Sequence, residues 1–315
     1  MRPDQVVGER LGFGASGLGN LYGEVDPVVA RATVDAAWDA GVRYFDTAPH
    51  YGLGLSEERL GEALAGRPRD EYSLSTKVGR LLVPNPDWAD GVMDDQGFAV
   101  PARLRRVWDP TESGIRRSLE GSLERLGVDR VDMIFLHDPE SYDVDEAVRV
   151  ALPALVRLRD EGLVREVGVG SNSVEALTRC VESADLDVLM VAGRYTLLEQ
   201  PAGALFDRCV ELGTSVVNVG IFNSGLLARA VVPDDARYDY APAPPALLAK
   251  ARELAQICQE YGVELPTAAL HVALRHPAVR SVLVGANRPD HVREAARRLA
   301  EPVPEQLWER LSDRG

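Results

Sequence analysis

The chain contains little cysteine, no long apolar run and no excess of positive charge. Three cysteines, Cys180, Cys209 and Cys258, are widely separated in 315 residues. An odd number of cysteines without close spacing matches neither a disulfide framework nor a cysteine-ligated metal site. We therefore expect three buried thiols in a reducing compartment, and no metal centre.

Apolar runs long enough to cross a membrane are also missing, since a spanning helix needs about 18–20 apolar residues. The segment from Met1 to Leu11 lacks the apolar stretch of a signal peptide. A content of 45% hydrophobic and 27% charged residues is that of an ordinary globular protein. These features predict a soluble, cytoplasmic protein.

The scarcity of basic residues relative to acidic ones gives a formal net charge of −14. Nucleic acids and anionic membranes require a basic surface, so neither is expected as a partner. A single basic pocket for a phosphate group remains compatible with this charge. The sequence does not indicate an oligomeric state.

Short β-prone runs alternate with longer amphipathic segments along the whole chain. Several runs are almost continuously apolar, which is typical of parallel strands covered on both faces. The predicted strands are Arg10–Gly17, Tyr44–Ala48, Tyr72–Val78, Val131–Asp138, Glu166–Ser171, Val188–Tyr195, Ser215–Phe222 and Ser281–Gly285. Strand and helix alternate about eight times without a linker, so residues 1–315 are predicted to form a single α/β domain.

The helices between these strands have recognisable ends. Asp26 followed by Pro27 is an N-cap signal, Gly127 ends a segment that starts at Ser113, and one long helix is expected over Val144–Arg159.

Such a chain closes into a (β/α)8 TIM barrel or opens into a doubly wound sheet. Gly12-Phe13-Gly14-Ala15-Ser16-Gly17 matches the glycine pattern of a doubly wound dinucleotide-binding fold. The residues that follow are too glycine-rich to open a helix, and no acidic residue ends a second strand about 20 positions later. The pattern favours a barrel, with these glycines in the loop after its first strand.

Two segments, Gly79–Asp109 and Asn223–Pro245, are expected to be long loops poor in regular structure. Both follow predicted strands, so both lie at the C-terminal face, where barrel active sites are built. We expect these two loops to line a substrate pocket, with Trp88 and Trp108 among its lining residues.

Three chemically useful side chains end successive predicted strands. Asp46, Lys77 and His137 lie at these positions, and Tyr51 follows in the loop after Asp46. A free tyrosine has a pKa near about 10 and is a poor acid–base group at neutral pH. A neighbouring Lys77 ammonium is expected to lower that pKa, with Asp46 holding the lysine and His137 orienting a substrate oxygen.

These residues resemble the motifs of the aldo-keto reductases. The matching segments are Asp46-Thr47-Ala48-Pro49-His50-Tyr51-Gly52, Ser75-Thr76-Lys77, Leu136-His137-Asp138 and Gly168-Val169-Gly170-Ser171-Asn172. The resemblance implies a catalytic tetrad of Asp46, Tyr51, Lys77 and His137. It also implies a nicotinamide cofactor, whose carboxamide Ser171 and Asn172 would hold.

A narrower resemblance concerns the D-threo-aldose 1-dehydrogenase branch of that family. It rests on Ala48–Gly54, Ala192–Leu198 and Phe222-Asn223-Ser224-Gly225. It implies oxidation of a sugar's anomeric carbon to a lactone, with His50 in the substrate pocket. The cofactor contacts implied by the resemblance are Phe222, Ser224, Gly225, Gly285, Asn287, Arg288 and His291.

Some positions depart from the family pattern. Ala192 replaces a glutamine that contacts the carboxamide, and Val219 replaces a tyrosine that stacks on the nicotinamide. Asn287 stands where many relatives have the arginine that binds the 2′-phosphate of NADP. Arg288 is one place further along, so the pattern favours NAD over NADP while leaving both open.

Other functions remain as alternatives. The same residues suit an NADPH-dependent aldehyde or ketone reductase, or a non-catalytic nicotinamide-binding regulatory subunit. A lyase or glycosidase on a plain barrel would need a metal cluster or paired carboxylates at strand ends, and the sequence shows neither.

Overall fold

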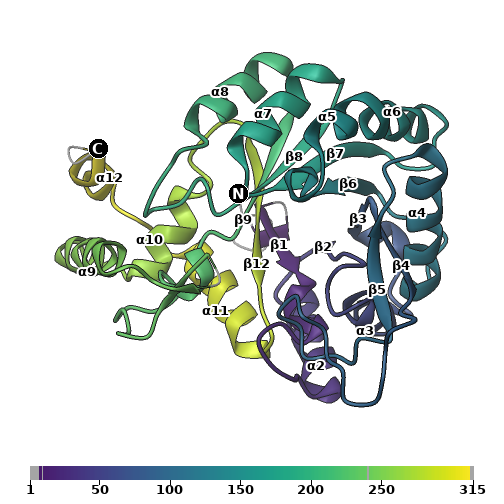
Figure 1. Cartoon of the computed structure of the whole chain (residues 1–315). Coiled ribbons are helices and arrows are strands. Elements are labelled where there is room, and N and C mark those ends of the chain that lie inside the picture. Colours follow the sequence, from purple (N-terminus) through teal and green to yellow (C-terminus); the bar gives the residue numbers. More distant parts are fainter. Residues whose placement is uncertain (1–6, 9, 240, 313–315) are drawn as a thin grey trace.

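Eight parallel strands close into a barrel in the computed structural model, which describes residues 7–312 apart from 9 and 240 (Figure 1). In spatial order the strands are β1 (Leu11–Gly14), β12 (Val279–Gly285), β9 (Ser215–Val219), β8 (Val188–Ala192), β7 (Glu166–Ser171), β6 (Met133–His137), β3 (Ser73–Val78) and β2 (Tyr44–Asp46). Each predicted barrel strand is found. The (β/α)8 barrel is confirmed, and the doubly wound sheet is wrong.

Helices form a layer around the barrel, as Figure 1 shows. They are α2 (Pro27–Asp39), α3 (Leu55–Leu64), α4 (Glu112–Leu126), α6 (Leu152–Asp160), α7 (Val174–Ser183), α8 (Gly203–Leu212), α10 (Leu265–Val272) and α11 (Pro289–Ala300). Two further helices lie outside this layer: α9 (Pro245–Glu260), which packs against α10, and α12 (Glu305–Ser312), which packs against α9. The helix expected over Val144–Arg159 is divided into α5 (Val144–Glu146), a π-helical turn η4 (Ala147–Ala151) and α6.

Local signals explain several helix ends. The Asp26 carboxylate accepts a 2.7 Å hydrogen bond from the backbone N–H of Val28 and so caps α2. Gly127 ends α4 in the left-handed conformation at φ 64°, which glycine adopts without steric cost. Both predicted ends are confirmed.

The inside of the barrel has an apolar layer and a polar layer. Seven buried side chains form the apolar layer: Tyr44, Met133, Phe135, Val188, Met190, Val217 and Leu283. Alternate residues of a strand point to the same face. Asp46 therefore points into the barrel as Tyr44 does on β2, and Lys77 points to the same face as Ser75 on β3. These positions place polar groups in the interior towards the C-terminal end, where the site is expected.

The prediction of little regular structure for Gly79–Asp109 is wrong. β4 (Arg80–Pro84) and β5 (Leu104–Trp108) form an antiparallel hairpin in which Arg80 is paired with Trp108. Residues 85–103 separate the two strands, so local pattern could not reveal their pairing. In the described part of the second segment, before α9 begins at Pro245, the regular structure is the turn η5 (Asn223–Gly225) and a two-residue pairing of β10 (Arg237–Tyr238) with β11 (Ala241–Pro242).

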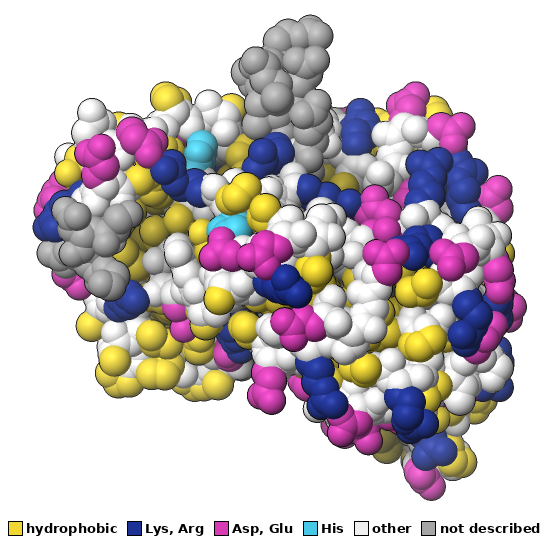
Figure 2. All heavy atoms as spheres, turned by 90° about the horizontal axis from the view of Figure 1, so that it is seen from above, with side chains coloured by type: hydrophobic (Ala, Val, Ile, Leu, Met, Phe, Trp, Pro, Cys, Tyr) yellow, Lys and Arg dark blue, Asp and Glu magenta, His cyan; other side chains and the backbone are white. Residues whose placement is uncertain are grey.

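Cys180, Cys209 and Cys258 are free and buried, as expected. Basic and acidic side chains are interspersed on the face seen in Figure 2. Among the described residues, no helix combines the length and apolar character that a bilayer crossing requires.

Candidate active site

The four predicted tetrad residues come together at the C-terminal end of the barrel. Asp46 ends β2, His137 ends β6, and Lys77 is next to last on β3. Lys77 Nζ lies 2.6 Å from Asp46 Oδ2 and 4.7 Å from the centre of the Tyr51 ring. The Tyr51 and His137 rings meet edge to face, with centres 5.7 Å apart. The arrangement expected from strand ends is therefore present.

The loop that carries Tyr51 is held against the turn η1 (Ala15–Gly19) after β1. A side chain on Gly52, which has φ 64°, would come within 2.4 Å of the Gly19 carbonyl oxygen. Glycine is required here for both its conformation and the close approach. Ser56 Oγ donates to the Ala15 carbonyl at 2.7 Å and accepts from Thr47 Oγ1 at 2.9 Å. These contacts fix the position of Tyr51.

Lys77 and Asp46 form a buried ion pair, with 2% and 3% of their surface exposed. Burial alone favours the neutral amine, but Asp46 and Tyr51 outweigh it and raise the pKa of Lys77 above its ordinary value. Burial also raises the pKa of Asp46, while Lys77 and Ser75 oppose that rise. Lys77 therefore presents a fixed ammonium to Tyr51.

The pKa of Tyr51 is raised, which contradicts the lowering expected from the sequence. Burial is the largest cause, and the Lys77 charge opposes it without overcoming it. Asp46, which neutralises much of the Lys77 charge, raises the pKa of Tyr51 further. The phenol is consequently protonated at neutral pH, with the Lys77 ammonium held beside its ring.

Two imidazoles face Tyr51. His50 and His137 meet edge to face with ring centres 5.4 Å apart. Burial, followed by the charge of Arg80, lowers the pKa of His50 to about 2 and that of His137 well below its usual value. Both rings are neutral, and Nδ1 of each is buried without a hydrogen-bond partner among the described residues. Such atoms favour a polar ligand that supplies the missing bonds.

Several residues around the tetrad escaped the sequence analysis. Arg80 is buried and binds Asp138 at 2.8 Å, and Asp138 Oδ2 lies 3.4 Å from His137 Nε2. Asp138 belongs to the Leu136-His137-Asp138 motif but was given no role, and Arg80 lies three residues after Lys77. Arg106 donates to the His50 carbonyl at 2.8 Å, and the Phe98 ring centre lies 5.3 Å from that of His50. No sequence pattern marked these last two.

The two tryptophans proposed for the pocket lie in different places. Trp108 is at the base of the hairpin, where its ring stacks on Tyr142 with centres 4.4 Å apart. Arg80 lies over the same Tyr142 ring, so Trp108 is close to the tetrad. Trp88 lies beyond β4, where it contacts the Arg103 guanidinium. These contacts place Trp108 near the tetrad and Trp88 against Arg103.

The residues proposed for cofactor binding follow three strands, β7, β9 and β12. Ser171 is buried and donates to Glu140 Oε1 at 2.6 Å, whereas Asn172 is exposed. Phe222 precedes the turn η5, in which Ser224 has φ 58° and Gly225 has φ 98°.

Gly285 ends β12, and Asn287, Arg288 and His291 lie at the start of α11. Arg288 and His291 are exposed. Within the described part of the chain, neither side chain makes an ion pair or hydrogen bond.

Two features of this region suit a nucleotide cofactor. Asn223 is buried, yet neither polar atom of its side chain has a hydrogen-bond partner among the described residues. The first turn of α11 has no side-chain cap, so its backbone N–H groups are available to a phosphate.

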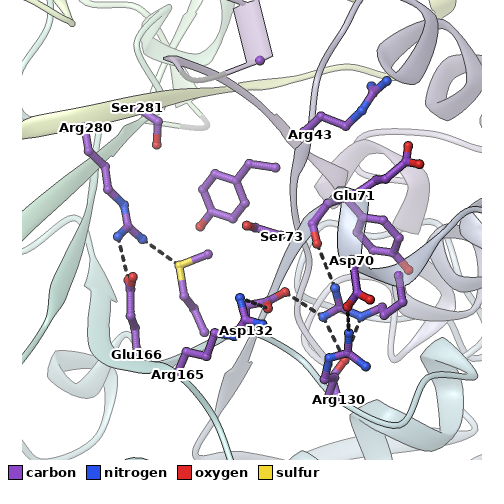
Figure 3. Close-up of a pocket in the computed structure, with 15 residues that line it drawn as sticks. Arg43, Asp70, Glu71, Ser73, Arg130, Asp132, Arg165, Glu166, Arg280 and Ser281 are labelled. Carbon is purple, nitrogen blue, oxygen red and sulfur yellow. Dashed lines mark hydrogen bonds and ion pairs between the residues drawn. The ribbon is translucent and has the colours of Figure 1, made fainter.

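A cavity of about 530 Å³ lies at the opposite, N-terminal end of the barrel (Figure 3). The residues that line it begin strands rather than end them, including Ser73, Met133 and Glu166. Arg280 in its wall is paired with Glu166 at 2.6 Å. The interior of the barrel separates this cavity from the tetrad. No group of three or more potential metal-binding side chains occurs among the described residues.

Comparisons with known proteins agree with this geometry. The model of the aldo/keto reductase family matches residues 10–313. A D-threo-aldose 1-dehydrogenase from a Pseudomonas species is 50% identical over 96% of this chain and 93% of its own length. A pyridoxal 4-dehydrogenase from Microbacterium luteolum is 36% identical over 97% and 93%. The holo form of an aldo-keto reductase from Bacillus halodurans has a TM-score of 0.74 at 26% identity, covering 96% of this chain and 91% of that one.

Proposed function

Because the chain belongs to the aldo/keto reductase family, we propose that it is an NAD(P)-dependent dehydrogenase that oxidises the anomeric carbon of an aldose to a lactone. The buried Lys77–Asp46 pair against the Tyr51 ring is the observation that carries this proposal. The D-threo-aldose 1-dehydrogenase that matches nearly the whole chain supports the substrate class.

In this proposal Tyr51 exchanges a proton with the substrate, and Lys77, Asp46 and His137 assist this exchange. Tyr51 accepts the proton of the anomeric hydroxyl, and the Lys77 ammonium stabilises the phenolate that this requires. Asp46 fixes Lys77, and neutral His137 hydrogen-bonds the reacting oxygen without adding charge. His50 and Trp108 line the substrate side. The unpartnered ring nitrogens of the two histidines suit a ligand rich in hydroxyl groups.

The cofactor would lie along the ends of β7, β9 and β12. Ser171 and Asn172 would hold the carboxamide. Phe222, Ser224 and Gly225 would contact the middle of the cofactor. The start of α11 would bind a phosphate. When bound, it supplies the hydride acceptor.

The direct test is an initial-rate screen of aldoses with NAD⁺ and NADP⁺, following the absorbance of the reduced cofactor. We expect aldoses with the D-threo arrangement to be oxidised. Absence of turnover with every aldose, in protein that binds NADH, contradicts the proposal.

The pH profile is expected to differ between the two directions. Oxidation needs the Tyr51 phenolate, and because the pKa of Tyr51 is raised, its rate should climb into the alkaline range. Reduction uses protonated Tyr51, so its rate should stay level from neutral to moderately alkaline pH. Initial rates in both directions across one buffer series measure this. An oxidation rate that falls with rising pH contradicts the role of Tyr51.

Cofactor preference is expected to favour NAD, since Asn287 carries no charge for a 2′-phosphate. Asn287→Arg should lower the KM for NADP⁺ by about tenfold to hundredfold, the worth of a charge-assisted hydrogen bond. Fluorescence titration with NADH and NADPH provides the binding readout. Arg288→Gln is the matched control and should change the NAD⁺ KM by less than about threefold. Tight NADPH binding that is lost in Arg288→Gln would assign the phosphate to Arg288 instead.

A second candidate is reduction of an aldehyde or ketone by NADPH. The raised pKa of Tyr51 favours it, because a protonated phenol is ready to donate to a carbonyl oxygen. The ratio of kcat/KM for aldehydes with NADPH to that for aldoses with NAD⁺ separates the two.

A further inference from the structure

A hydrogen-bond chain continues from the tetrad into the barrel interior. Ser75 Oγ lies 2.7 Å from Asp46 Oδ1, and the Tyr44 hydroxyl lies 3.0 Å from Ser75 Oγ. Ser75 is fully buried, and Tyr44 is 8% exposed within the apolar layer of the barrel. The chain thus runs from Tyr44 through Ser75 and Asp46 to Lys77, and Lys77 lies against Tyr51.

The direction of each hydrogen bond follows from the charge of Asp46. An ionised carboxylate only accepts hydrogen bonds, and its other oxygen, Oδ2, accepts from Lys77. Ser75 has a single hydroxyl proton, which it must therefore donate to Oδ1. Ser75 Oγ then accepts a hydrogen bond from the Tyr44 hydroxyl. Each donation strengthens the next one along the chain.

We propose that Ser75 and Tyr44 are positioning residues for this reaction: Ser75 keeps Asp46 ionised, Tyr44 orients Ser75, and Asp46 thereby holds Lys77 against Tyr51. This rests on the proposed function in taking Tyr51 as the acid–base group. Ser75 is fully buried, and Tyr44 lines the cavity at the N-terminal end of the barrel, so both act through Asp46.

The charged groups around Asp46 support a specific role for Ser75. On β3, Lys77 and Ser75 face the carboxylate, and both lower its pKa against the effect of burial. On β1, the residue paired with Asp46 is Gly14, which brings no charge. Tyr51 faces Asp46 from the following loop. Both Ser75 and Lys77 favour ionised Asp46. Without Ser75, Lys77 alone of these two would favour it.

Arg280 and Glu166 affect Tyr44, the residue at the end of the hydrogen-bond chain farthest from Lys77. They lie near Tyr44 and influence its hydroxyl with opposite signs. Burial, the largest cause, raises the pKa of Tyr44, so it remains a neutral donor throughout the working pH range.

The test is the pH profile of the reductive direction in Ser75→Ala, because Tyr51 stays protonated in that direction and does not itself impose an acidic limb. Removal of the donor raises the pKa of Asp46, so the acidic limb, where activity falls as Asp46 takes up a proton, should move up by about 1–2 pH units. Activity should recover toward the wild-type value at higher pH. Tyr44→Phe keeps the ring in the apolar layer and should move the limb in the same direction by a smaller amount.

A matched control is Ser118→Ala, which removes a buried serine hydroxyl that has no hydrogen-bond partner among the described residues. Its profile should coincide with that of the wild type. If Ser75→Ala lowers the rate equally at every pH, or leaves the acidic limb in place, the proposal is overturned. If Ser75→Ala does not fold, Tyr44→Phe decides: an acidic limb at the wild-type pH in Tyr44→Phe also overturns the proposal.

The ionisation of Asp46 can also be followed without turnover. Carboxyl ¹³C NMR of cofactor-free protein, with Asp46→Asn to assign the signal, reports its protonation directly. A titration moved to higher pH in Ser75→Ala supports the chain even if no aldose is oxidised, whereas an unchanged titration refutes it. Failure of the wild type to oxidise aldoses counts against the proposed function alone.

Discussion

Tyr51→Phe is expected to lose about 100- to 10,000-fold in kcat, the usual contribution of a general acid–base group, while binding NADH as the wild type does. The substitution removes only the hydroxyl. The ring retains its contacts with His137 and Phe98, so the shape of the site is preserved. Initial rates and fluorescence titration on the same preparation measure the two quantities.

Tyr72→Phe is a suitable control for this variant. Tyr72 is a buried tyrosine of the outer core that packs edge to face on Phe45, away from the tetrad. Its variant should turn over at the wild-type rate. Substantial turnover by Tyr51→Phe would remove Tyr51 from the proposed acid–base role.

Lys77→Met should abolish turnover and also destabilise the protein by about 3–5 kcal/mol, the cost of leaving a buried charge unpaired. Methionine is unbranched like lysine and only one atom shorter, so most of the loss reflects the missing charge rather than a cavity. Asp46 would keep its hydrogen bond from Ser75 but lose its counter-ion. Urea unfolding measures the change in free energy.

The double variant Asp46→Asn/Lys77→Met separates stability from catalysis. It removes both charges, so it should recover most of the lost stability while remaining inactive. Recovery of turnover in the double variant would mean that the ion pair acts only on folding. A Lys77→Met protein as stable as the wild type would contradict the buried-pair interpretation.

The barrel was predictable because its strands are local features. Segments such as Val131–Asp138 are apolar enough to be recognised without knowing their neighbours. The β4–β5 hairpin was not, because Arg80 and Trp108 pair across a long intervening segment. Its strands also mix charged and apolar residues, as in Leu104-Arg105-Arg106-Val107-Trp108, which gives no continuous apolar signal.

The tetrad was predictable for a geometric reason. Residues at the carboxyl ends of parallel strands in a closed barrel meet at one rim, so Asp46, Lys77 and His137 could be placed together from strand ends alone. The residues around the tetrad depend on the β4–β5 hairpin, which was not predicted. The contact of Arg106 with His50 could therefore not be predicted either. Burial cannot be read from a motif, which is why the pKa of Tyr51 was expected to change in the wrong direction.

Transfer of a deuterium label from the anomeric carbon tests the central claim most directly. An aldose deuterated at C1 is incubated with the enzyme and NAD⁺, and the reduced cofactor is examined by mass spectrometry. The proposed reaction predicts one deuterium in each molecule of NADH formed. Unlabelled NADH, with the deuterium retained in the sugar product, would show that oxidation occurs at another carbon and would contradict the account.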